Sequence, residues 1–439
     1  MSELKKEILK FLEKCAESHD GLPEYISGPK NKKSKNGKYP RVLYSGPVWD
    51  ENEIAAAIES LISGTWVSSG EKVREFERKF SKVAGVKHSL MVNSGSSANL
   101  AMIHALKKCL GWNDGDEIIL SAVGFPTTLN PILQSGLTPV FVDISKDDLN
   151  WDLDEVEKKI TDRTVAVFSS PVLGNLYDLD RLKSICDNNS IAMIGDNCDS
   201  LGTLWRGKSI FDYFIASSCS FYPAHHITTG EGGMVSSNRD DIVRTARSFA
   251  WWGRDCYCVG SANLLTEGTC GKRFNKWLEG YYDGLLDHKY LFVNRGYNLK
   301  PLDLQGSIGC EQLEKIEFIH NARRENKEKI SAYFKSIAGI SIPEELENSE
   351  TSWFGVPVIC ESNTLKAALV SHLESNGIQT RNYFAGNILL HPAYRELDDF
   401  RKYPNANTVL DKVFFVGCSP NYTDEVIQYI GNTIQDFSQ

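Results

Sequence analysis

Hydrophobic residues in the first half of the chain fall in short runs that alternate with longer segments of helical periodicity. The runs are bounded by polar or glycine-containing segments, which is typical of buried strands. Segments such as 178–189 instead place apolar residues three and four positions apart, which indicates helices. The predicted strands are 88–92, 116–123, 138–144, 164–170, 191–196 and 212–221. This alternation predicts a mostly parallel sheet with helices on both faces and ligands at the carboxyl ends of its strands.

The two ends of the chain differ from this pattern. Apolar residues recur at helical spacing between positions 4 and 15, which predicts an amphipathic helix that docks on the body or on a second subunit. A polar, basic stretch at 29–40 then indicates a linker or an exposed loop. After residue 300, a long helical stretch at 303–334 precedes weaker strand signals. We therefore predict an N-terminal helix and linker at 1–40, a large domain at 41–298 and a smaller C-terminal α/β domain at 299–439.

Composition narrows the class of protein mainly by exclusion. The 439 residues suffice for one large core and a second domain. A net charge of -9 argues against nucleic acid as a partner, although a local basic pocket for one small phosphate ligand is compatible with it. The sequence has neither a secretory signal nor an apolar run long enough to span a bilayer, so we expect a cytoplasmic protein. The eleven scattered cysteines are expected to be free thiols or metal ligands.

Three motifs near strand ends carry candidate chemistry. Gly95 and Ser96 follow the strand 88–92 and begin a helix, whose first amides could bind an anion, although a plain serine-capped helix fits as well. Asp196 ends a buried strand, where its carboxylate either pairs with a protonated ring nitrogen of a bound cofactor or caps a loop. Phe125 either stacks on an aromatic ring or packs in the core. Each motif alone is a modest signal, but the three motifs in this order are a specific signal of a cofactor site.

Their order and spacing resemble the sugar aminotransferase family typified by DegT, DnrJ, EryC1 and StrS. The resemblance covers nearly the whole chain after residue 40 and rests on the segments SGPVW, NSGSSAN, GFPTT, GDNCDSLG, SFYPAHHITTGEGG and GYNLKPLDLQGSIGCEQLEKI. It implies the fold-type-I, aspartate-aminotransferase-like architecture of pyridoxal-phosphate-dependent transferases, with the cofactor in the large domain. It also implies pyridoxal chemistry on a nucleotide-linked keto-sugar.

The same resemblance implies roles for individual residues. Gly95, Ser96 and Ser220 would hold the cofactor phosphate. Phe125 would stack on the cofactor ring, and Asp196 would bind its nitrogen. Asn298 resembles the residue that reaches the phosphate from a neighbouring subunit, which implies a homodimer or a higher homo-oligomer with shared active sites.

The segment SFYPAHHITTGEGG, residues 220–233, departs from the family pattern. His225 stands where the family usually has the lysine that forms a Schiff base with the cofactor aldehyde. Imidazole cannot form that bond, so we expect pyridoxamine 5′-phosphate held without a covalent link, with His225 free to act as a base. Asp199 and Tyr222 also depart from the family pattern and would line the cofactor near His225. Drift in an inactive paralogue is the alternative, whereas the keto-sugar 3-dehydrase branch combines these features.

Four cysteines extend the comparison with that branch. Cys198, Cys256, Cys258 and Cys270 match the ligand count of a [2Fe–2S] cluster, but a zinc site or free thiols fit the count too. Their spacing resembles that of the CDP-4-keto-6-deoxyglucose 3-dehydrases, which carry such a cluster beside pyridoxamine phosphate. The last spacing is longer than is usual in that group, and an insertion in a surface loop is tolerable.

The resemblance thus implies removal of the C3 hydroxyl from a CDP-linked 4-keto-6-deoxyhexose. Electrons for the reduction would come from a separate NAD(P)H-dependent reductase with flavin and its own iron–sulfur centre. The 3,6-dideoxy sugar formed could serve lipopolysaccharide O-antigen. Two alternatives stay open: a cluster-free GDP-4-keto-6-deoxymannose 3-dehydrase-like enzyme, and a non-catalytic nucleotide-sugar-binding protein.

Overall fold

A seven-stranded sheet forms the centre of the computed structural model, which describes residues 2–18, 39, 41–64, 67–256, 258 and 270–437. Its strand order is β1-β9-β8-β5-β4-β2-β3. The bounds are β1 His88–Val92, β2 Glu117–Ser121, β3 Thr138–Val142, β4 Thr164–Ser169, β5 Ala192–Asp196, β8 Ala216–Ser220 and β9 Gly233–Ser237. All six strands predicted from the hydrophobic runs are therefore confirmed. The prediction of a mostly parallel sheet is confirmed too, because β9 alone among these seven strands runs in the direction opposite to the other six.

The reversal at β9 positions the segment with the unusual histidines. Two parallel neighbours need a long crossover connection, usually a helix. Only residues 221–232 connect β8 to β9, and they contain no helix, so β9 returns antiparallel beside β8. This segment is thereby held at the carboxyl end of β8, next to the carboxyl ends of β1 and β5.

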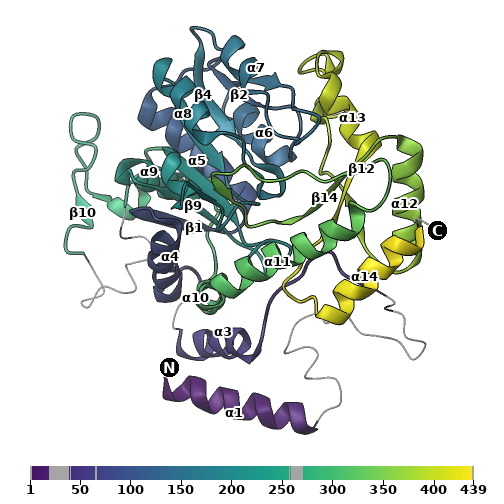
Figure 1. Cartoon of the computed structure of the whole chain (residues 1–439). Coiled ribbons are helices and arrows are strands. Elements are labelled where there is room, and N and C mark those ends of the chain that lie inside the picture. Colours follow the sequence, from purple (N-terminus) through teal and green to yellow (C-terminus); the bar gives the residue numbers. More distant parts are fainter. Residues whose placement is uncertain are drawn as a thin grey trace.

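Helices cover both faces of this sheet (Figure 1). Helix α5 packs on β8 and β9, α9 packs on β1 and β9, and α8 packs on β5. The bounds of the helices in this part of the chain are α3 Glu51–Ser63, α4 Glu71–Ala84, α5 Gly95–Leu110, α6 Pro126–Gln134, α7 Leu153–Lys158, α8 Leu179–Asn188 and α9 Asp240–Ala250. The sheet is therefore buried, as its apolar strands predict.

The C-terminal part forms a second, antiparallel sheet of order β12-β14-β16-β15. Its strands are β12 Ile340–Ser341, β14 Gly355–Cys360, β15 Thr380–Asn382 and β16 Val413–Gly417. The helices are α10 Asp303–Glu314, α11 Ile316–Phe334, α12 Asn363–Ser375, α13 Pro404–Lys412 and α14 Asp424–Phe437. The long helical stretch predicted at 303–334 is thus two helices that meet at Lys315. Tyr39 and Val42 are buried in the apolar core of this part.

Helix α1, Glu3–Ser18, confirms the amphipathic helix predicted at the N-terminus. Ile8 and Leu12 bury their side chains against Ala55 of α3, so this helix docks on the body of the same chain. A salt bridge of 2.7 Å between Lys5 and Glu311 adds a polar contact to α10. The linker predicted at 29–40 lies outside the described residues apart from position 39.

Short strands complete the described elements: β6 Leu204–Trp205, β7 Lys208–Ser209 and β13 Ser349–Glu350 form one small sheet, and β10 Phe274–Asn275 pairs with β11 Leu286–Asp287. Figure 1 shows β10 in an extension that stands clear of the body. Within the described ranges, no helix has both the length and the apolar character needed to cross a membrane.

Candidate active site

A cavity of about 410 Å³ lies at the carboxyl ends of β1, β5 and β8. Its volume is in the range of pockets that hold small ligands or cofactors. Of the residues singled out in the sequence, those that line it are Gly95, Ser96, Phe125, Asp196, Cys198, Asp199, Ser220, Tyr222 and His225. The fold therefore gathers these residues from four separate segments around one space.

One end of the cavity is the beginning of helix α5. Ser94 caps this helix, and its hydroxyl accepts a hydrogen bond of 3.1 Å from the amide of Ser97. A Cβ atom at Gly95 would lie 2.5 Å from the Cβ of Ser220, so only glycine allows this close approach. The serine-capped helix and the candidate anion site are thus both present: Ser94 provides the cap, while Ser96 and Ser220 face the cavity beside the positive helix end.

Asp196 at the end of β5 is held in a fixed orientation. Its Oδ2 accepts hydrogen bonds of 2.8 Å from Asn99 and 2.6 Å from Thr128. The carboxylate is 6% exposed and still lines the cavity. A buried carboxylate with two short hydrogen bonds is well placed to accept a further one from a cationic ring nitrogen. Asn99 and Thr128 lie within the motifs NSGSSAN and GFPTT, but no local sequence signal indicated that they orient Asp196.

Phe125 provides an aromatic wall. It is 53% exposed, which excludes the core-packing alternative, and it meets Phe384 edge to face with ring centroids 6.0 Å apart. Its position immediately before α6 places the ring at the cavity rather than beneath it. The phenyl face is therefore available to stack on a planar ligand.

His225 lies inside the cavity wall, between Tyr222 and Phe354. Its Nδ1 is 3.5 Å from Asp199 Oδ1 and is buried without a hydrogen-bond partner within the described structure. Burial, with the positive charge of the nearby Arg323 guanidinium as the next cause, lowers the pKa of His225 to about 3. The imidazole is therefore neutral at pH 7, and one of its two ring nitrogens carries no proton.

The Arg323 guanidinium holds the backbone around His225. It is 1% exposed and donates to the carbonyl oxygens of His225 at 3.3 Å and of Phe354 at 3.0 Å. Because Arg323 comes from α11 and Phe354 precedes β14, this contact joins the C-terminal part of the chain to the segment after β8. No sequence signal marked Arg323, since a lone arginine in an amphipathic helix is ordinarily a surface residue.

Asp199 is the second titratable group beside His225. Burial, with the charge of Asp196 as the next cause, raises its pKa to about 7. The amide of Leu173 donates to its Oδ2 at 3.3 Å. In the unfolded chain the carboxyl recovers its ordinary, lower pKa, so the folded protein binds this proton more tightly.

Replacing Asp199 by asparagine is therefore expected to change how stability depends on pH. The contribution of Asp199 is present below about pH 4 and is lost as the pH rises to about 7. Asparagine cannot ionise, so the free energy of unfolding of the variant should rise relative to the unsubstituted protein over this interval, by a few kcal/mol, and then level off. Denaturant unfolding of the cofactor-free proteins across this pH range measures the difference. A constant difference between the two curves would contradict the raised pKa.

The four cysteines are not all in one place. Cys256 and Cys258 have their sulfur atoms 2.9 Å apart. Burial and the adjacent thiols of Cys256 and Cys270 raise the pKa of Cys258 to about 12. Cys198 lines the cavity instead, close to Asp196 and Cys219. Within the described residues, no three His, Cys, Asp or Glu side chains are arranged as a ready metal site. The donors suit a thiolate-bound metal, but the set is only partly assembled.

Asn298 lies apart from the cavity. It is exposed, it pairs with Trp251 through an isolated β-bridge, and its side-chain oxygen accepts a hydrogen bond from Lys300. Three aromatic residues that do line the cavity, Tyr44, Phe354 and Phe384, were missed in the sequence. They come from segments that are distant in sequence and carry no local motif.

This combination of fold and cavity defines a class of protein. A mostly parallel sheet carries a helix N-terminus, an oriented carboxylate and an aromatic face at its carboxyl edge, as expected of a pyridoxal-phosphate-type fold that binds a phosphorylated ring. The family model for DegT/DnrJ/EryC1/StrS aminotransferases matches residues 48–435, and the chain belongs to this family.

Relatives within the family include 3-dehydratases. The chain is 38% identical to a dTDP-4-dehydro-2,6-dideoxy-D-glucose 3-dehydratase of Saccharopolyspora spinosa, covering 90% of this chain and 86% of that protein. It is 36% identical to the lipopolysaccharide biosynthesis protein RfbH of Salmonella typhimurium, covering 90% and 91%. The solved structure of Escherichia coli GDP-4-keto-6-deoxy-D-mannose-3-dehydratase with bound hydrated PLP superposes with a TM-score of 0.78 at 30% identity, covering 90% and 100%. The predicted family and fold-type-I architecture are thereby confirmed.

Proposed function

We propose that the protein is a pyridoxamine-phosphate-dependent 3-dehydrase that removes the C3 hydroxyl of a nucleotide-linked 4-keto-6-deoxyhexose. One observation carries the proposal: His225, with a neutral and unpartnered Nδ1, lines the cavity where an aminotransferase of this family needs its lysine. Among the described residues that line the cavity there is no lysine at all. Without this lysine the protein cannot bind the aldehyde form of the cofactor as a Schiff base, so the residue at this position is expected to have a different role.

The cavity residues fit the cofactor. A Cβ atom at Gly95 would occupy the space beside Ser220, so the glycine keeps this space open. The helix end with Ser96 and Ser220 suits a phosphate. Asp196 would hold the ring nitrogen in its protonated state, and Phe125 would cover one ring face. Pyridoxamine phosphate would supply the amine that combines with the C4 ketone, together with an electron-withdrawing ring.

The protein's own groups would then move the protons. His225 accepts a proton through its open Nδ1, and Arg323 keeps its backbone in place. Asp199, with a pKa raised to about 7 and an oxygen 3.5 Å from that nitrogen, can exchange the proton onward. Tyr222 closes the cavity beside His225. Asn298 would reach the phosphate of a second subunit in a homodimer, which its exposed position permits.

A [2Fe–2S] cluster on Cys198, Cys256, Cys258 and Cys270 would supply the reducing electrons. The close sulfurs of Cys256 and Cys258, with Cys270 beside them, support three of these four ligands. The electrons would come from an NAD(P)H-dependent flavin and iron–sulfur reductase. A CDP-linked 4-keto-6-deoxyhexose is the proposed substrate.

Anaerobic purification tests the proposal. We expect about two iron and two sulfide per chain, as the cluster formula requires, together with bound pyridoxamine phosphate. Assays with CDP-, GDP- and dTDP-linked 4-keto-6-deoxyhexoses then identify the nucleotide. Transfer of an amine to the sugar without loss of the C3 hydroxyl would contradict the reaction proposed.

Replacing Cys256 by alanine is expected to abolish the cluster while pyridoxamine phosphate still binds. The reason is that Cys256 is a ligand candidate that does not line the cofactor cavity. Iron analysis and the visible absorbance of the cluster measure the loss. Cys186→Ala, the same change at a buried thiol in α8, is the control and should keep full iron content. A full cluster in Cys256→Ala would overturn the ligand assignment.

A cluster-free 3-dehydrase is the second candidate function. It is favoured by the lack of a ready metal group among the described residues and by the 34% identity to GDP-4-keto-6-deoxy-D-mannose 3-dehydratase of Yersinia pseudotuberculosis, covering 89% of this chain. Metal-free protein that turns over with glutamate as the amine donor would establish this alternative.

A further inference from the structure

Among the described residues that line the cofactor cavity, none is a lysine or an arginine. Three carboxyl groups do line it, those of Asp196, Asp199 and Glu231. The helix end at Ser96 suits the cofactor phosphate, but the substrate proposed above carries a diphosphate as well. Negative charges in the lining would repel that group. Binding of a nucleotide sugar therefore calls for a cation just outside the lining, at the mouth of the cavity.

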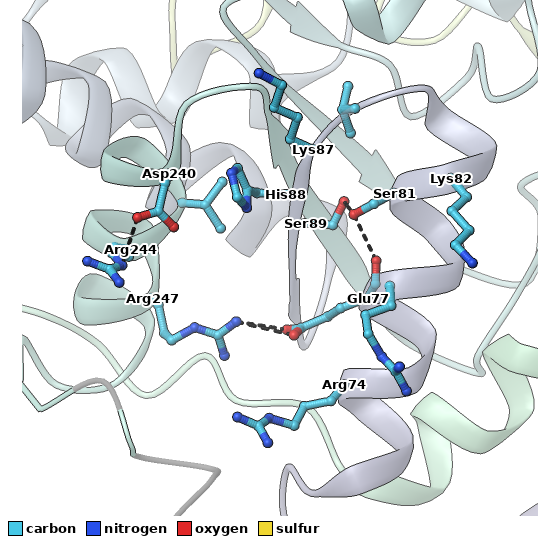
Figure 2. Close-up of a pocket in the computed structure, with 13 residues that line it drawn as sticks. Arg74, Glu77, Ser81, Lys82, Lys87, His88, Ser89, Asp240, Arg244 and Arg247 are labelled. Atoms are coloured by element: carbon cyan, nitrogen blue, oxygen red, sulfur yellow. Dashed lines mark hydrogen bonds and ion pairs between the residues drawn. The ribbon is translucent and has the colours of Figure 1, made fainter.

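A group of cations elsewhere in the protein lies too far away for this purpose. Figure 2 shows it around a cavity of about 580 Å³, where cations of α4 face those of α9. That cavity is at the amino end of β1, with His88 in its lining, whereas Ser94 lines the cofactor cavity beyond the carboxyl end, on the order of 17 Å away along the strand. The diphosphate is attached to the same sugar ring that reacts, so its cation must be next to the cofactor cavity.

The segment that follows β15 forms the wall of the cavity on the side of the C-terminal part. Phe384 in this segment lines the cavity and has a φ of 47°, a left-handed conformation that is uncommon for a residue other than glycine. Asn387 pairs with Val123 through an isolated β-bridge, which ties the segment to the residues before Phe125. Backbone conformations of this kind persist where the surrounding structure holds them, and they are concentrated at functional sites. The end of β15 is therefore held firmly beside the cavity.

Arg381, three residues before Phe384, has its guanidinium against the cavity wall. It stands opposite Phe415 in the β15–β16 pair, so the two side chains lie on the same face of the sheet. Both contact Tyr44, which lines the cavity. The guanidinium carbon of Arg381 lies 4.3 Å from the centre of the Tyr44 ring, and the Phe415 ring meets it edge to face with centroids 6.0 Å apart. Tyr44 is thus a platform that holds the guanidinium in place.

The environment of the Tyr44 hydroxyl places Arg381 at the mouth of the cavity. Burial raises the pKa of this hydroxyl, the charge of Arg381 lowers it, and the nearby Tyr222 and Asp199 raise it. Tyr222 and Asp199 both line the cavity, and Tyr222 is 49% exposed, so it lies at the mouth. One hydroxyl is thus close to the guanidinium and to two groups of the lining. A ligand that extends from the cavity past Tyr222 would come within reach of Arg381.

The Arg381 guanidinium has donors available for a ligand. Its Nη1 donates to the carbonyl oxygen of Thr380 at 2.7 Å, and the side chain is exposed. Within the part of the chain that the structure describes, no carboxylate forms an ion pair with it. A guanidinium has five N–H groups and binds phosphate oxygens through two parallel hydrogen bonds. Arg323, by contrast, is 1% exposed and donates to backbone carbonyl oxygens.

The position of Arg381 favours a diphosphate over a carboxylate, which a guanidinium binds in the same way. The carboxylate of an amino-acid amine donor is one bond away from the carbon that carries the reacting nitrogen, so its partner would have to be inside the lining. The diphosphate of a nucleotide sugar is separated from the reacting carbons by the sugar ring. It would therefore lie at the mouth of the cavity, which is where Arg381 is.

We propose that Arg381 binds the diphosphate group of the nucleotide sugar at the mouth of the cofactor cavity, with Tyr44 as the platform that positions its guanidinium. This inference rests on the proposed 3-dehydrase function, because it names a residue that recognises the substrate of the same site. Hydrogen bonds to phosphate oxygens do not depend on the base, so the binding of CDP, GDP and dTDP should depend on Arg381 alike.

Calorimetric titration of the full chain, loaded with pyridoxamine phosphate, with CDP, GDP and dTDP tests the proposal without any turnover. Arg381→Gln should bind the nucleoside diphosphates about 10- to 100-fold more weakly than the unsubstituted protein, because charged hydrogen bonds to phosphate are lost. Arg381→Lys keeps the charge but loses the planar fork, so its affinity should fall between the two. The control Arg401→Gln removes the same charge from an exposed position of the C-terminal part outside the cavity lining and should change the affinity less than about twofold.

The outcomes separate this inference from the function on which it rests. Unchanged affinity in Arg381→Gln, or equal weakening in Arg401→Gln, would overturn the role of Arg381 and leave the proposed function standing. Loss of glutamate binding in Arg381→Gln, with nucleoside diphosphate affinity unchanged, would assign Arg381 to a carboxylate and overturn it too. Failure of the unsubstituted protein to bind all three nucleoside diphosphates would count against the proposed function itself. Should Arg381→Gln fail to fold, Arg381→Lys takes its place, with a weakening of at least about threefold expected.

Discussion

The variant His225→Asn is expected to dehydrate the nucleotide sugar about 10²- to 10⁴-fold more slowly than the unsubstituted protein, while it still binds pyridoxamine phosphate. The loss follows if His225, whose Nδ1 is buried without a hydrogen-bond partner in the described structure, is the proposed base, because asparagine offers no group that titrates there. The cofactor phosphate and ring would be held by other residues, so binding should change only a few-fold. Steady-state rates and cofactor binding by absorbance provide the two measurements.

His320→Asn is the matched control for this prediction. His320 is also a partly buried imidazole, and burial, with the charges of Arg323 and Arg324 as further causes, lowers its pKa to about 3, but it does not line the cofactor cavity. Its Nδ1 contacts the hydroxyl of Ser352 at 2.7 Å. We expect this variant to lose stability more than activity. Equal loss of activity in the two variants would mean that His225 acts only by packing, and an unchanged rate in His225→Asn would eliminate it as the base.

The variant Asp196→Asn is expected to bind pyridoxamine phosphate about 10- to 100-fold more weakly and to slow dehydration at least as much. The carboxylate, fixed by Asn99 and Thr128, is the group that would hold a protonated ring nitrogen. Asparagine has nearly the same shape but no charge, so the ring would lose its proton and with it much of its ability to withdraw electrons. The absorbance of the bound cofactor reports the protonation of the ring.

Asp199→Asn supplies the control for Asp196→Asn. Both changes remove a carboxyl from the same cavity, but the raised pKa of Asp199 means that this group is only partly ionised at neutral pH. We expect Asp199→Asn to retain cofactor affinity and the absorbance of a protonated ring. If both variants lost affinity equally, the effect would be one of general charge, and Asp196 would not be the partner of the ring nitrogen.

The strands and the residues at their ends could be predicted from the sequence because they depend on local periodicity. The buried strands end where apolar runs end, and Asp196 and Gly95 therefore fell at the carboxyl edge of the sheet. His225 was also detectable, since a single substitution within a long motif is a local signal. The direction of β9 was not, because pairing with β8 depends on how a connecting segment folds in space.

The residues that complete the site were beyond sequence analysis for the same reason. Phe384 and Phe354 reach the cavity from the C-terminal part, and Arg323 becomes a buried clamp only when α11 packs against the segment after β8. The pKa of Asp199 rises because the fold removes water from it and places Asp196 nearby. The burial of a side chain and its distance from residues of other segments cannot be inferred from the spacing of residues along the chain.

The sequence by itself determined the alternation of strands and helices, the family, and the replacement of the expected lysine by His225. These features follow from the order and spacing of residues that are close together in the sequence, and both can be read directly from the sequence. Only the tertiary structure decided which side chains share a cavity, which titratable groups lose water, and that the cations of α4 face those of α9. The physical reason is that burial and electrostatic interaction depend on distances between segments far apart in the chain, and packing alone fixes those distances.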